Sequence, residues 1–450
     1  MPPHDLDLLV IGAGSGGVRA ARLAGRLGRR AAIVEEWTVG GTCVHRGCIP
    51  KKFYVFASHF ADEFADARAY GWTVPEPSFD WPALVAAKKK ELARLEGLYE
   101  KGLADAQVEL VRGRAVLEDA HTARVGERRI GAETILVSTG SRPYMPEIPG
   151  AELMITSDEV FDLPALPGRV LIAGAGYIAL EFAGILNGLG SEVTVVYRGE
   201  GVLRGFDEDV RAAVREEMEK KGIRFRFETV FARIDRTADG LAVATSHGDV
   251  MTADAVLMAA GRRPNTAAMG LEAAGVKLAE NGAVAVDAHS RSSVPNIYAV
   301  GDVTSRRNLT PVAIHEAVCL IETLYKDKPT APDHRDIASA VFTQPPVGTV
   351  GLTEAEARAE LGAVEIYRSR FRPLKFTVSG RDERVMAKLV VDAASRRVVG
   401  AHMVGIDAPE IVQALAVAVK AGVTKEQWDA TMAVHPTTAE EFVVMYDRAE

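Results

Sequence analysis

The sequence predicts an α/β protein with two parallel-sheet domains of similar design and a C-terminal α+β domain. Two observations lead to this prediction: a strand–turn–helix–strand pattern that occurs twice, and a change of character near residue 336. The first copy starts with LDLLVIGAGSGG (residues 6–17) and the second with VLIAGAGYIA (residues 170–179). Each apolar run enters a glycine-rich turn and then a helical stretch, which is typical of a parallel nucleotide-binding sheet.

The remaining elements follow in order. The helical stretches (residues 18–27 and 178–189) precede second apolar runs at 31–34 and 193–196. Strand-like runs at 135–143 and 256–265 both end in glycine and proline, where chain crossings between domains are expected. Apolar runs at 387–391 and 398–404 and an amphipathic helix at 408–421 indicate a separate domain. We expect residues 1–142 and 265–335 to form one discontinuous domain, 143–264 an inserted domain and 336–450 the third.

Length and composition exclude several classes of protein. A chain of 450 residues is expected to hold roughly three domains. The formal net charge of -8 argues against a nucleic acid partner, which needs a basic face. No apolar run approaches the about 20 residues of a membrane span, and no signal peptide precedes the first motif, so we expect no membrane association and a cytoplasmic location. The three lysines at 88–90 are expected on a solvated helix face.

The first glycine-rich turn, GAGSGG (residues 12–17), predicts a dinucleotide site. Glycines allow the tight turn and let the backbone approach a pyrophosphate at the helix N-terminus. Glu35 ends the next strand, 23 residues beyond Gly12, where a carboxylate accepts hydrogen bonds from ribose hydroxyls. An adenosine ribose without a 2′-phosphate suits this site, and FAD is the simplest assignment.

The second turn, GAGYIA (residues 174–179), lacks that acid. Tyr197 occupies the position that corresponds to Glu35, and Arg198 and Arg204 follow it. A ribose 2′-phosphate repels a carboxylate and binds guanidinium groups in a bidentate manner. The second Rossmann-like domain is therefore expected to bind NADPH rather than NADH.

Cys43 and Cys48 are two of only three cysteines and lie in GGTCVHRGCIPKK (residues 40–52). Five residues advance about 500° around an ideal helix, and a bridge needs Cα atoms within roughly 7 Å, so the backbone is expected to leave regular helix between them. Three interpretations are open: a metal site, for which only His45 lies nearby as a further ligand; a structural pair; and a redox-active disulfide, which fits best. The third cysteine, Cys319, is expected to be a small packed residue.

This segment resembles the redox-active disulfide of the flavoprotein disulfide reductases (class I pyridine nucleotide-disulfide oxidoreductases), and the bacterial glutathione reductase type in particular. The resemblance extends over essentially the whole chain, through GAGYIALE, VLRGFD, GRRPN, AVGDV, LTPVAI, QPPVGTVGLTE and HPTTAEE. It implies NADPH-dependent reduction of glutathione disulfide to two glutathione molecules, which maintains the cellular thiol pool. It also implies that the C-terminal domain is a dimerisation domain and that the protein is a homodimer with a shared active site.

The resemblance assigns roles to individual residues. Cys48 is the implied flavin-facing thiolate, and Cys43 is the thiol that attacks the substrate. His435, oriented by Glu440, is the implied acid–base group and would act on the disulfide of the partner subunit. Lys51 would lie near the flavin and pair with Glu181. The implied FAD-binding residues are Gly12, Gly14, Ser15, Gly16, Gly17, Glu35, Thr42, Lys51, Gly140, Asp302 and Thr310. The implied NADPH-binding residues are Gly174, Gly176, Tyr177, Ile178, Glu181, Arg198, Arg204 and Gly261. No metal is expected.

Substrate recognition is where the sequence departs from the family. The implied glutathione contacts are Ser15, Arg22 and Tyr99. Two further arginines of other members are replaced here by Leu23 and Val318, and each lost charge-assisted hydrogen bond weakens binding by about 1.5–3 kcal/mol. We therefore expect weaker binding of glutathione disulfide, or a preference for a less anionic relative such as glutathione amide. The positive charges of Arg19 and Arg22 argue against a polycationic disulfide such as that of trypanothione.

The alternatives are other reductases of the same fold and one protein of a different class. Dihydrolipoamide dehydrogenase shares the disulfide and the His–Glu pair but uses NAD, and Arg198 and Arg204 count against it. Mercuric reductase and large thioredoxin reductase carry additional C-terminal cysteines or a redox dipeptide, which the tail VVMYDRAE lacks. A non-catalytic flavin-binding protein would not be expected to keep both cysteines together with the His–Glu pair.

Overall fold

The computed structural model describes residues 4–449, which form two compact units, each assembled from segments distant in the sequence. Within the described residues, the first unit comprises residues 4–51, Ala83–Tyr144 and Gly261–His334. The second comprises Lys52–Pro82, Met145–Ala260 and residues 335–449, and so contains both the second glycine-rich turn and the C-terminal segment. The division into three domains stays a prediction.

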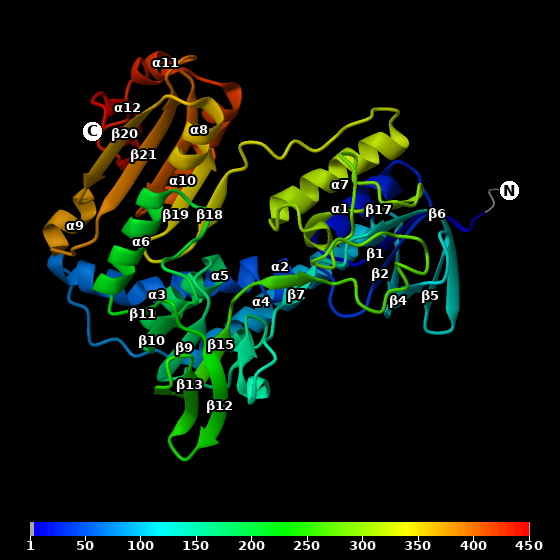
Figure 1. The fold of residues 1–450 in the computed structure, drawn as a ribbon, viewed down its shortest axis with the longest axis horizontal. Coiled ribbons are helices and arrows are strands. Elements are labelled where there is room, and N and C mark those ends of the chain that lie inside the picture. Colours follow the sequence, from blue (N-terminus) through cyan, green and yellow to red (C-terminus); the bar gives the residue numbers. More distant parts are fainter. Residues whose placement is uncertain (1–3, 450) are drawn as a thin grey trace. The chain divides into compact units, whose positions relative to one another are not determined.

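A seven-stranded sheet forms the centre of the first unit (Figure 1). Its order is β3-β2-β1-β6-β5-β4, and β17 pairs with β6. The pairs β1–β2, β1–β6, β2–β3 and β6–β17 are parallel, whereas β4, β5 and β6 are joined in antiparallel fashion. The strands are β1 (Leu6–Ile11), β2 (Ala31–Glu35), β3 (Glu109–Arg112), β4 (Ala115–Leu117), β5 (Thr122–Val125), β6 (Arg128–Val137) and β17 (Ile297–Ala299), and a separate antiparallel pair is formed by β7 (Ser141–Pro143) and β16 (Arg262–Pro264).

Both faces of this sheet are covered. Leu8 and Val10 of β1 pack in one hydrophobic cluster and Leu9 and Ile11 in another, so alternate residues enter opposite cores. This explains why the strand is a continuous apolar run. Helices α1 (Ser15–Arg26) and α7 (Thr310–Tyr325) lie side by side in this unit (Figure 1). The other helical segments that begin in it or enter it are α2 (Gly41–His45), α3 (Cys48–Ala69), α4 (Trp81–Ala104) and η3 (Gly301–Thr304).

One sequence-based expectation about α4 is wrong. The helix begins at Trp81, as predicted, but Lys88 is buried, whereas its neighbours Lys89 and Lys90 are exposed. A run of like charges indicates a solvated face, yet three successive residues of a helix cannot share one face. Lys88 therefore lies on the packed side of the helix.

The second unit contains the repeated parallel sheet, in the order β11-β10-β9-β15-β8. All its pairs are parallel, which confirms the predicted α/β fold class for this part of the chain. The strands are β8 (Ile155–Thr156), β9 (Arg169–Ala173), β10 (Glu192–Val196), β11 (Arg224–Arg226) and β15 (Ala255–Met258), accompanied by α5 (Tyr177–Gly188), α6 (Glu208–Lys220), the short segments η1 (Ala151–Leu153) and η2 (Val160–Asp162), and an antiparallel sheet of β12 (Phe231–Thr237), β13 (Gly240–Thr245) and β14 (Val250–Ala253).

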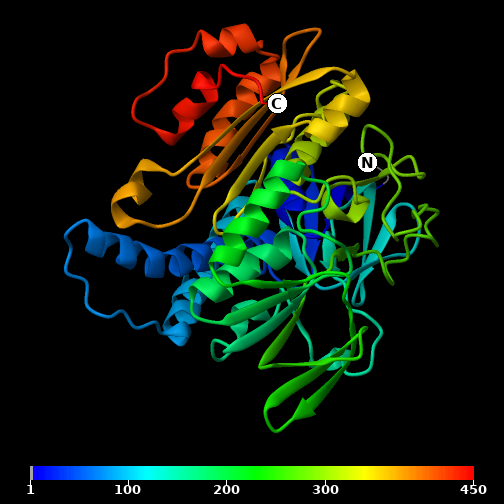
Figure 2. The ribbon, with the colours of Figure 1, turned by 60° about the vertical axis from the view of Figure 1, so that its left-hand side comes forward.

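The C-terminal segment folds as an antiparallel sheet with the order β18-β19-β22-β21-β20. In Figure 2 the orange helix α10 (Ala408–Ala421) lies along this sheet, where Ala408 and Val412 enter the core. The predicted strands and helix of this region are confirmed. The elements are β18 (Ser339–Val341), β19 (Val347–Gly351), β20 (Val364–Phe371), β21 (Val385–Asp392), β22 (Val398–Val404), α8 (Glu354–Leu361), α9 (Leu374–Ser379), α11 (Lys425–Asp429), η4 (Thr438–Glu440) and α12 (Glu441–Val444).

A buried lysine joins three segments of the second unit. Lys388 of β21 is 1% exposed, and its Nζ donates to Asp207 Oδ1 at 2.8 Å, Asp209 Oδ2 at 2.6 Å and Glu354 Oε2 at 2.8 Å. Burial alone would lower the pKa of Lys388, but the three carboxylates outweigh burial and raise it. Asp207 also caps α6 through the N–H of Asp209. The cluster therefore fixes the start of α6 against β21 and α8.

Candidate functional site

The first glycine-rich turn packs closely against Ser138, the residue that follows β6. Gly12 has a φ of +102°, and a Cβ there would lie 2.6 Å from the carbonyl oxygen of Ser138. A Cβ at Gly17 would lie 2.0 Å from the carbonyl oxygen of Gly12, whereas a Cβ at Gly14 would meet nothing within 4 Å. Helix α1 starts at Ser15 without a side-chain cap. No side-chain cap therefore occupies its first N–H groups, which are the groups that bind a pyrophosphate at a helix N-terminus.

Glu35 is held beside this turn. Its Oε2 accepts a hydrogen bond from the N–H of Ala13 at 2.7 Å, and its Oε1 accepts one from the N–H of Trp37 at 2.8 Å. Burial raises the pKa of Glu35, and the two N–H groups counteract only part of that effect. The carboxylate therefore has a fixed position next to the glycine turn, which fits recognition of ribose hydroxyls.

Two more predicted FAD residues adjoin Ser141: Gly140 precedes it in the chain, and Asp302 accepts a hydrogen bond from its hydroxyl. Ser141 Oγ donates to Asp302 Oδ2 at 2.6 Å, and Arg262 Nε donates to Ser141 Oγ at 2.8 Å. The N–H of Gly301, next to Asp302, donates to Glu316 Oε2 at 2.7 Å.

Sequence reasoning missed Ser141 and Glu316 as supports of Asp302. Glu316 is 1% exposed and also pairs with Arg306 at 2.8 Å and His334 at 2.9 Å. The available signal was its position four residues from both Val312 and Leu320, on the apolar face of α7, because a buried carboxylate requires partners.

The cysteine pair lies at a break between two helices. Cys43 belongs to α2 and Cys48 is the first residue of α3. Gly40 and Gly41 have φ values of +107° and +60°, and a Cβ at Gly47 would lie 2.8 Å from the carbonyl oxygen of Thr42. The predicted departure from regular helix is therefore confirmed, and glycines make it possible.

The two sulfurs are in the thiol form and interact with each other. The hydrogen bond to Cys48, followed by burial, raises the pKa of Cys43, while Thr310 and Ser15 act in the opposite direction. Cys48 Sγ lies 3.5 Å from Thr310 Oγ1. Thr310 is the first residue of the 16-residue helix α7, whose N-terminus favours a nearby thiolate.

Arg22 and Tyr99, two predicted glutathione contacts, lie in the same unit near this pair. The guanidinium of Arg22 packs on Gly102, where a Cβ would lie 2.9 Å from its Cζ, and Arg22 Nε is buried without a hydrogen-bond partner in the described part of the chain. Burial, and then the proximity of Cys43, raises the pKa of Tyr99. Leu23 packs against the core of this unit and offers no charge.

The second glycine-rich turn repeats the geometry of the first. Gly174 has a φ of +119°, and a Cβ there would lie 2.4 Å from the carbonyl oxygen of Ala259, the counterpart of Ser138. A Cβ at Gly176 would meet nothing within 4 Å, and α5 starts at Tyr177 without a side-chain cap. Tyr177 is exposed and Ile178 half-buried. Gly261, predicted for the same nucleotide, begins the last segment of the first unit.

Arg198 and Arg204 are both exposed beyond the end of β10. Neither forms an ion pair with any residue between 4 and 449. Two unpaired guanidinium groups beside an open helix N-terminus suit a ribose 2′-phosphate.

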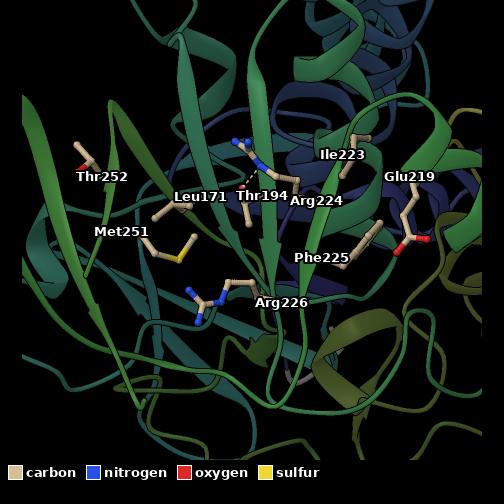
Figure 3. A pocket seen from close by; sticks show the side chains of 9 residues that line it. All are labelled: Leu171, Thr194, Glu219, Ile223, Arg224, Phe225, Arg226, Met251 and Thr252. Atoms are coloured by element: carbon tan, nitrogen blue, oxygen red, sulfur yellow. Dashed lines mark hydrogen bonds between the residues drawn. The ribbon is translucent and has the colours of Figure 1, made fainter. Parts of the chain in front are cut away.

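An open cavity of about 600 Å³ in the same unit is separate from these arginines (Figure 3). It lies around the edge strand β11, and its own two arginines are already engaged. Arg224 Nε donates to Thr194 Oγ1 at 3.3 Å, the dashed contact in Figure 3, and Arg226 pairs with Asp249. None of the residues predicted to bind NADPH lines this cavity. Its lining residues are Leu171, Thr194, Glu219, Ile223, Arg224, Phe225, Arg226, Met251 and Thr252.

Glu181 is buried in α5, and its Oε1 accepts a hydrogen bond from the N–H of Phe342 at 2.9 Å. The ring of Phe342 also lies 3.9 Å from Lys52 Nζ. Sequence reasoning missed Phe342, for which the sequence offers no signal. The predicted partner of Glu181 is Lys51, which belongs to the other unit, so their pairing stays a prediction.

His435 and Glu440 come together within one short segment. His435 Nδ1 lies 2.9 Å from Glu440 Oε2, and the imidazole is 79% exposed. The structure therefore brings this predicted pair into contact and leaves the ring accessible to another molecule.

Between residues 4 and 449 no helix is both long and apolar enough to cross a membrane. The same part of the chain has no cluster of three or more His, Cys, Asp or Glu side chains arranged to hold a metal ion.

Comparison with known proteins agrees with this arrangement. The family model of the pyridine nucleotide-disulphide oxidoreductases matches residues 6–317, and the model of their dimerisation domain matches residues 337–446. The chain is 51% identical over 448 residues to a glutathione reductase of Burkholderia cepacia, with 100% of both chains covered. It is 49% identical over 454 residues to the chloroplastic/mitochondrial glutathione reductase of Pisum sativum, covering 98% of this chain and 82% of that one. It is 39% identical over 466 residues to a trypanothione reductase of Trypanosoma congolense, covering 98% and 95%. The chain therefore belongs to the pyridine nucleotide-disulphide oxidoreductase family.

Proposed function

We propose that this protein uses NADPH to reduce glutathione disulfide to two glutathione molecules and acts in the cytoplasm. The observation that carries the proposal is the contact between the Cys43 and Cys48 thiols, with Thr310 Oγ1 3.5 Å from Cys48 Sγ, in the unit that holds the first glycine-rich turn. Relatives named glutathione reductase, at 49–51% identity, support the same substrate.

The cofactors are FAD and NADPH. The turn at Gly12–Gly17, Glu35 and Asp302 would hold FAD, and the second turn with Arg198 and Arg204 would hold NADPH. When bound, FAD supplies the two-electron relay between NADPH and the disulfide. The open space at Gly14 and Gly176 fits the approach of a pyrophosphate to each helix N-terminus.

The thiol chemistry belongs to the chain itself. The thiolate of Cys43 attacks one sulfur of glutathione disulfide, so that a mixed disulfide forms as the original S–S bond breaks and one glutathione thiolate leaves. The thiolate of Cys48 then attacks the sulfur of Cys43, which releases the second glutathione thiolate and leaves a Cys43–Cys48 disulfide. Two electrons from NADPH return this disulfide to two thiols.

His435 is proposed to protonate the leaving glutathione thiolates in the active site of the partner subunit. Its exposure and its place in the segment matched by the dimerisation model support this role. Glu440 holds the ring by its Nδ1, so Nε2 is the nitrogen that exchanges protons with substrate. A two-fold homodimer then contains two equivalent active sites, each using both chains.

The choice of disulfide follows from charge. The buried, unpartnered Nε of Arg22 provides one donor for a glutathione carboxylate, supported by Ser15 and Tyr99. Leu23 and Val318 provide none, so glutathione amide is the second candidate substrate. We expect trypanothione disulfide to be a poor substrate, because the positive charge of Arg22 repels a polycationic disulfide. We expect lipoamide to be a poor substrate because Arg198 and Arg204 favour NADPH, whereas dihydrolipoamide dehydrogenase uses NAD.

The test is oxidation of NADPH by the purified protein with each of these four disulfides in parallel. Glutathione disulfide or its amide should give the largest kcat/KM, and C43S should abolish turnover with both. Larger values for lipoamide with NADH, or full activity of C43S, would contradict the proposal.

A further inference from the structure

The helical turn that carries Cys43 has little internal support. Helix α2 contains only five residues, Gly41–His45. Gly40 and Gly41, both with positive φ, precede Cys43, and Gly47 follows it before α3 begins. The glycines add no side-chain contacts, so the position of the Cys43 sulfur depends on backbone hydrogen bonds, such as Gly40 N–H to the Ala13 carbonyl at 2.8 Å, and on the other side chains of the turn, of which Val44 is buried.

His45, the last residue of the turn, makes such a contact. Its Nε2 lies 3.0 Å from the carbonyl oxygen of Val39. A carbonyl oxygen only accepts, so Nε2 carries the proton and donates. Val39 is fully buried in the core, and its own N–H donates to Glu96 Oε1 at 3.1 Å. His45 thus ties the turn to a residue that is fixed by both packing and hydrogen bonding.

The neighbouring ring contacts strengthen this attachment. The guanidinium carbon of Arg46 lies 3.3 Å from the centroid of the Trp37 ring, and the His45 ring meets the same indole edge-on at 5.5 Å. Glu96 Oε2 lies 4.0 Å from His45 Nε2. The side chains of His45 and Arg46 therefore attach the turn to Trp37 and Val39.

We propose that His45 is a positioning residue that sets the redox equilibrium of the Cys43–Cys48 pair, an inference that rests on the proposed function. Oxidation joins the two sulfurs and releases two protons and two electrons, which an oxidant such as a disulfide accepts. The equilibrium depends on how closely the dithiol state already holds the two sulfurs together, that is, on their effective concentration. Releasing the turn lowers this concentration and makes the protein disulfide easier to reduce.

The flavin-loaded protein provides the test. It is equilibrated with defined mixtures of oxidised and reduced dithiothreitol, remaining thiols are trapped by alkylation, and the peptide with both cysteines is quantified by mass spectrometry. H45F keeps a ring against Trp37 but has no donor for Val39, and H45L serves if H45F does not fold. Either should lower the oxidation equilibrium constant about tenfold, which corresponds to a midpoint potential about 30 mV less negative.

Two further variants separate positioning from general damage. H45Q retains a donor that can bind the Val39 carbonyl and should restore most of the wild-type value. H247F removes an equivalent contact, between His247 Nε2 and the carbonyl of Glu228 at 3.1 Å, in the other unit, and should change nothing. Wild-type values in H45F and H45L, or no recovery in H45Q, would overturn the inference. Failure of the wild-type protein to form a Cys43–Cys48 disulfide at all would instead overturn the proposed function.

Discussion

The imidazole Nδ1 of His435 lies 2.9 Å from Oε2 of Glu440. A carboxylate accepts hydrogen bonds, so it keeps a proton on Nδ1 and fixes the orientation of the ring. Glu440 is itself held, because its N–H donates to Thr437 Oγ1 at 3.2 Å and that hydroxyl donates to the carbonyl of Val434 at 2.8 Å. The contacts that hold this proposed acid–base pair thus lie within one short segment of the chain.

Replacing the imidazole should remove proton transfer while leaving cofactor binding intact. We expect H435Q to lower kcat for glutathione disulfide by about 10²–10⁴-fold, the usual contribution of a positioned general acid. E440A should have a smaller effect, because the ring remains but is no longer held. Steady-state kinetics at saturating NADPH measures both, with H247Q as the matched control. A kcat for H435Q within twofold of the wild type would exclude the role.

The unpaired guanidinium groups should decide the nucleotide. R198A combined with R204A should raise KM for NADPH by about 10²–10⁴-fold, since each charge-assisted hydrogen bond contributes about 1.5–3 kcal/mol, and should leave KM for NADH almost unchanged. R226A is the control, because Arg226 already pairs with Asp249 in the same unit. An unaltered ratio of the KM values for NADPH and NADH would show that the 2′-phosphate is bound elsewhere.

Cys48 should control the reactivity of the Cys43 thiol. The hydrogen bond from the Cys43 thiol to Cys48 is the largest cause that raises the pKa of Cys43. A raised thiol pKa means less thiolate at neutral pH, so C48A should shift alkylation of Cys43 to lower pH. The rate of iodoacetamide labelling across a pH series, followed by peptide mass spectrometry, measures this shift. C319A is the control, because Cys319 is buried at 2% exposure in α7, and an identical pH dependence in C48A would refute the coupling.

The Lys388 cluster should dominate the stability of the second unit. K388M leaves carboxylates facing one another without their cation, which costs about 3–5 kcal/mol for a buried pair. K375M removes only the exposed pair between Lys375 and Glu63, and should cost at most about 1 kcal/mol. Urea unfolding of each variant compares the two free energies. An equal loss of unfolding free energy in K388M and K375M would show that burial does not strengthen the cluster.

The same cluster should make stability depend on pH at both extremes. Burial opposes ionisation of Asp207, but the N–H of Glu354 and the Lys388 ammonium outweigh it and lower the pKa of Asp207. A lowered carboxyl pKa stabilises the fold above about pH 4, and that contribution is lost as pH falls through the folded-state pKa. The raised pKa of Lys388 stabilises the fold below about pH 10.4, and its contribution is lost at higher pH. Urea titrations should therefore show an alkaline decline in the wild type that is weaker in K388M.

Local sequence patterns were enough to predict many of the elements of this structure. The two glycine turns, the strands that precede them and the C-terminal elements β21, β22 and α10 were predictable because periodicity and turn chemistry are properties of short segments. The break between Cys43 and Cys48 was predictable for the same reason, since five-residue spacing conflicts with regular helix.

Long-range partners were not predictable. Nothing near His45 in the sequence indicates that its ring faces Glu96, and nothing near Glu181 indicates Phe342. Lys88 was assigned to solvent because a run of lysines is usually exposed, and only the packing of α4 reveals the error. Such contacts depend on how distant segments meet, which composition and spacing do not encode.

The two glycine turns contain glycines of two different kinds, and a survey of all single substitutions would separate them. Gly12 and Gly174 have positive φ and abut the carbonyl oxygens of Ser138 and Ala259, so any side chain there should prevent accumulation of the protein itself. Gly14 and Gly176, with φ values of -75° and -81° and no atom near a Cβ, should tolerate alanine in expression while losing nucleotide. In both turns, the first glycine is thus expected to be required for folding, and the second for nucleotide binding alone.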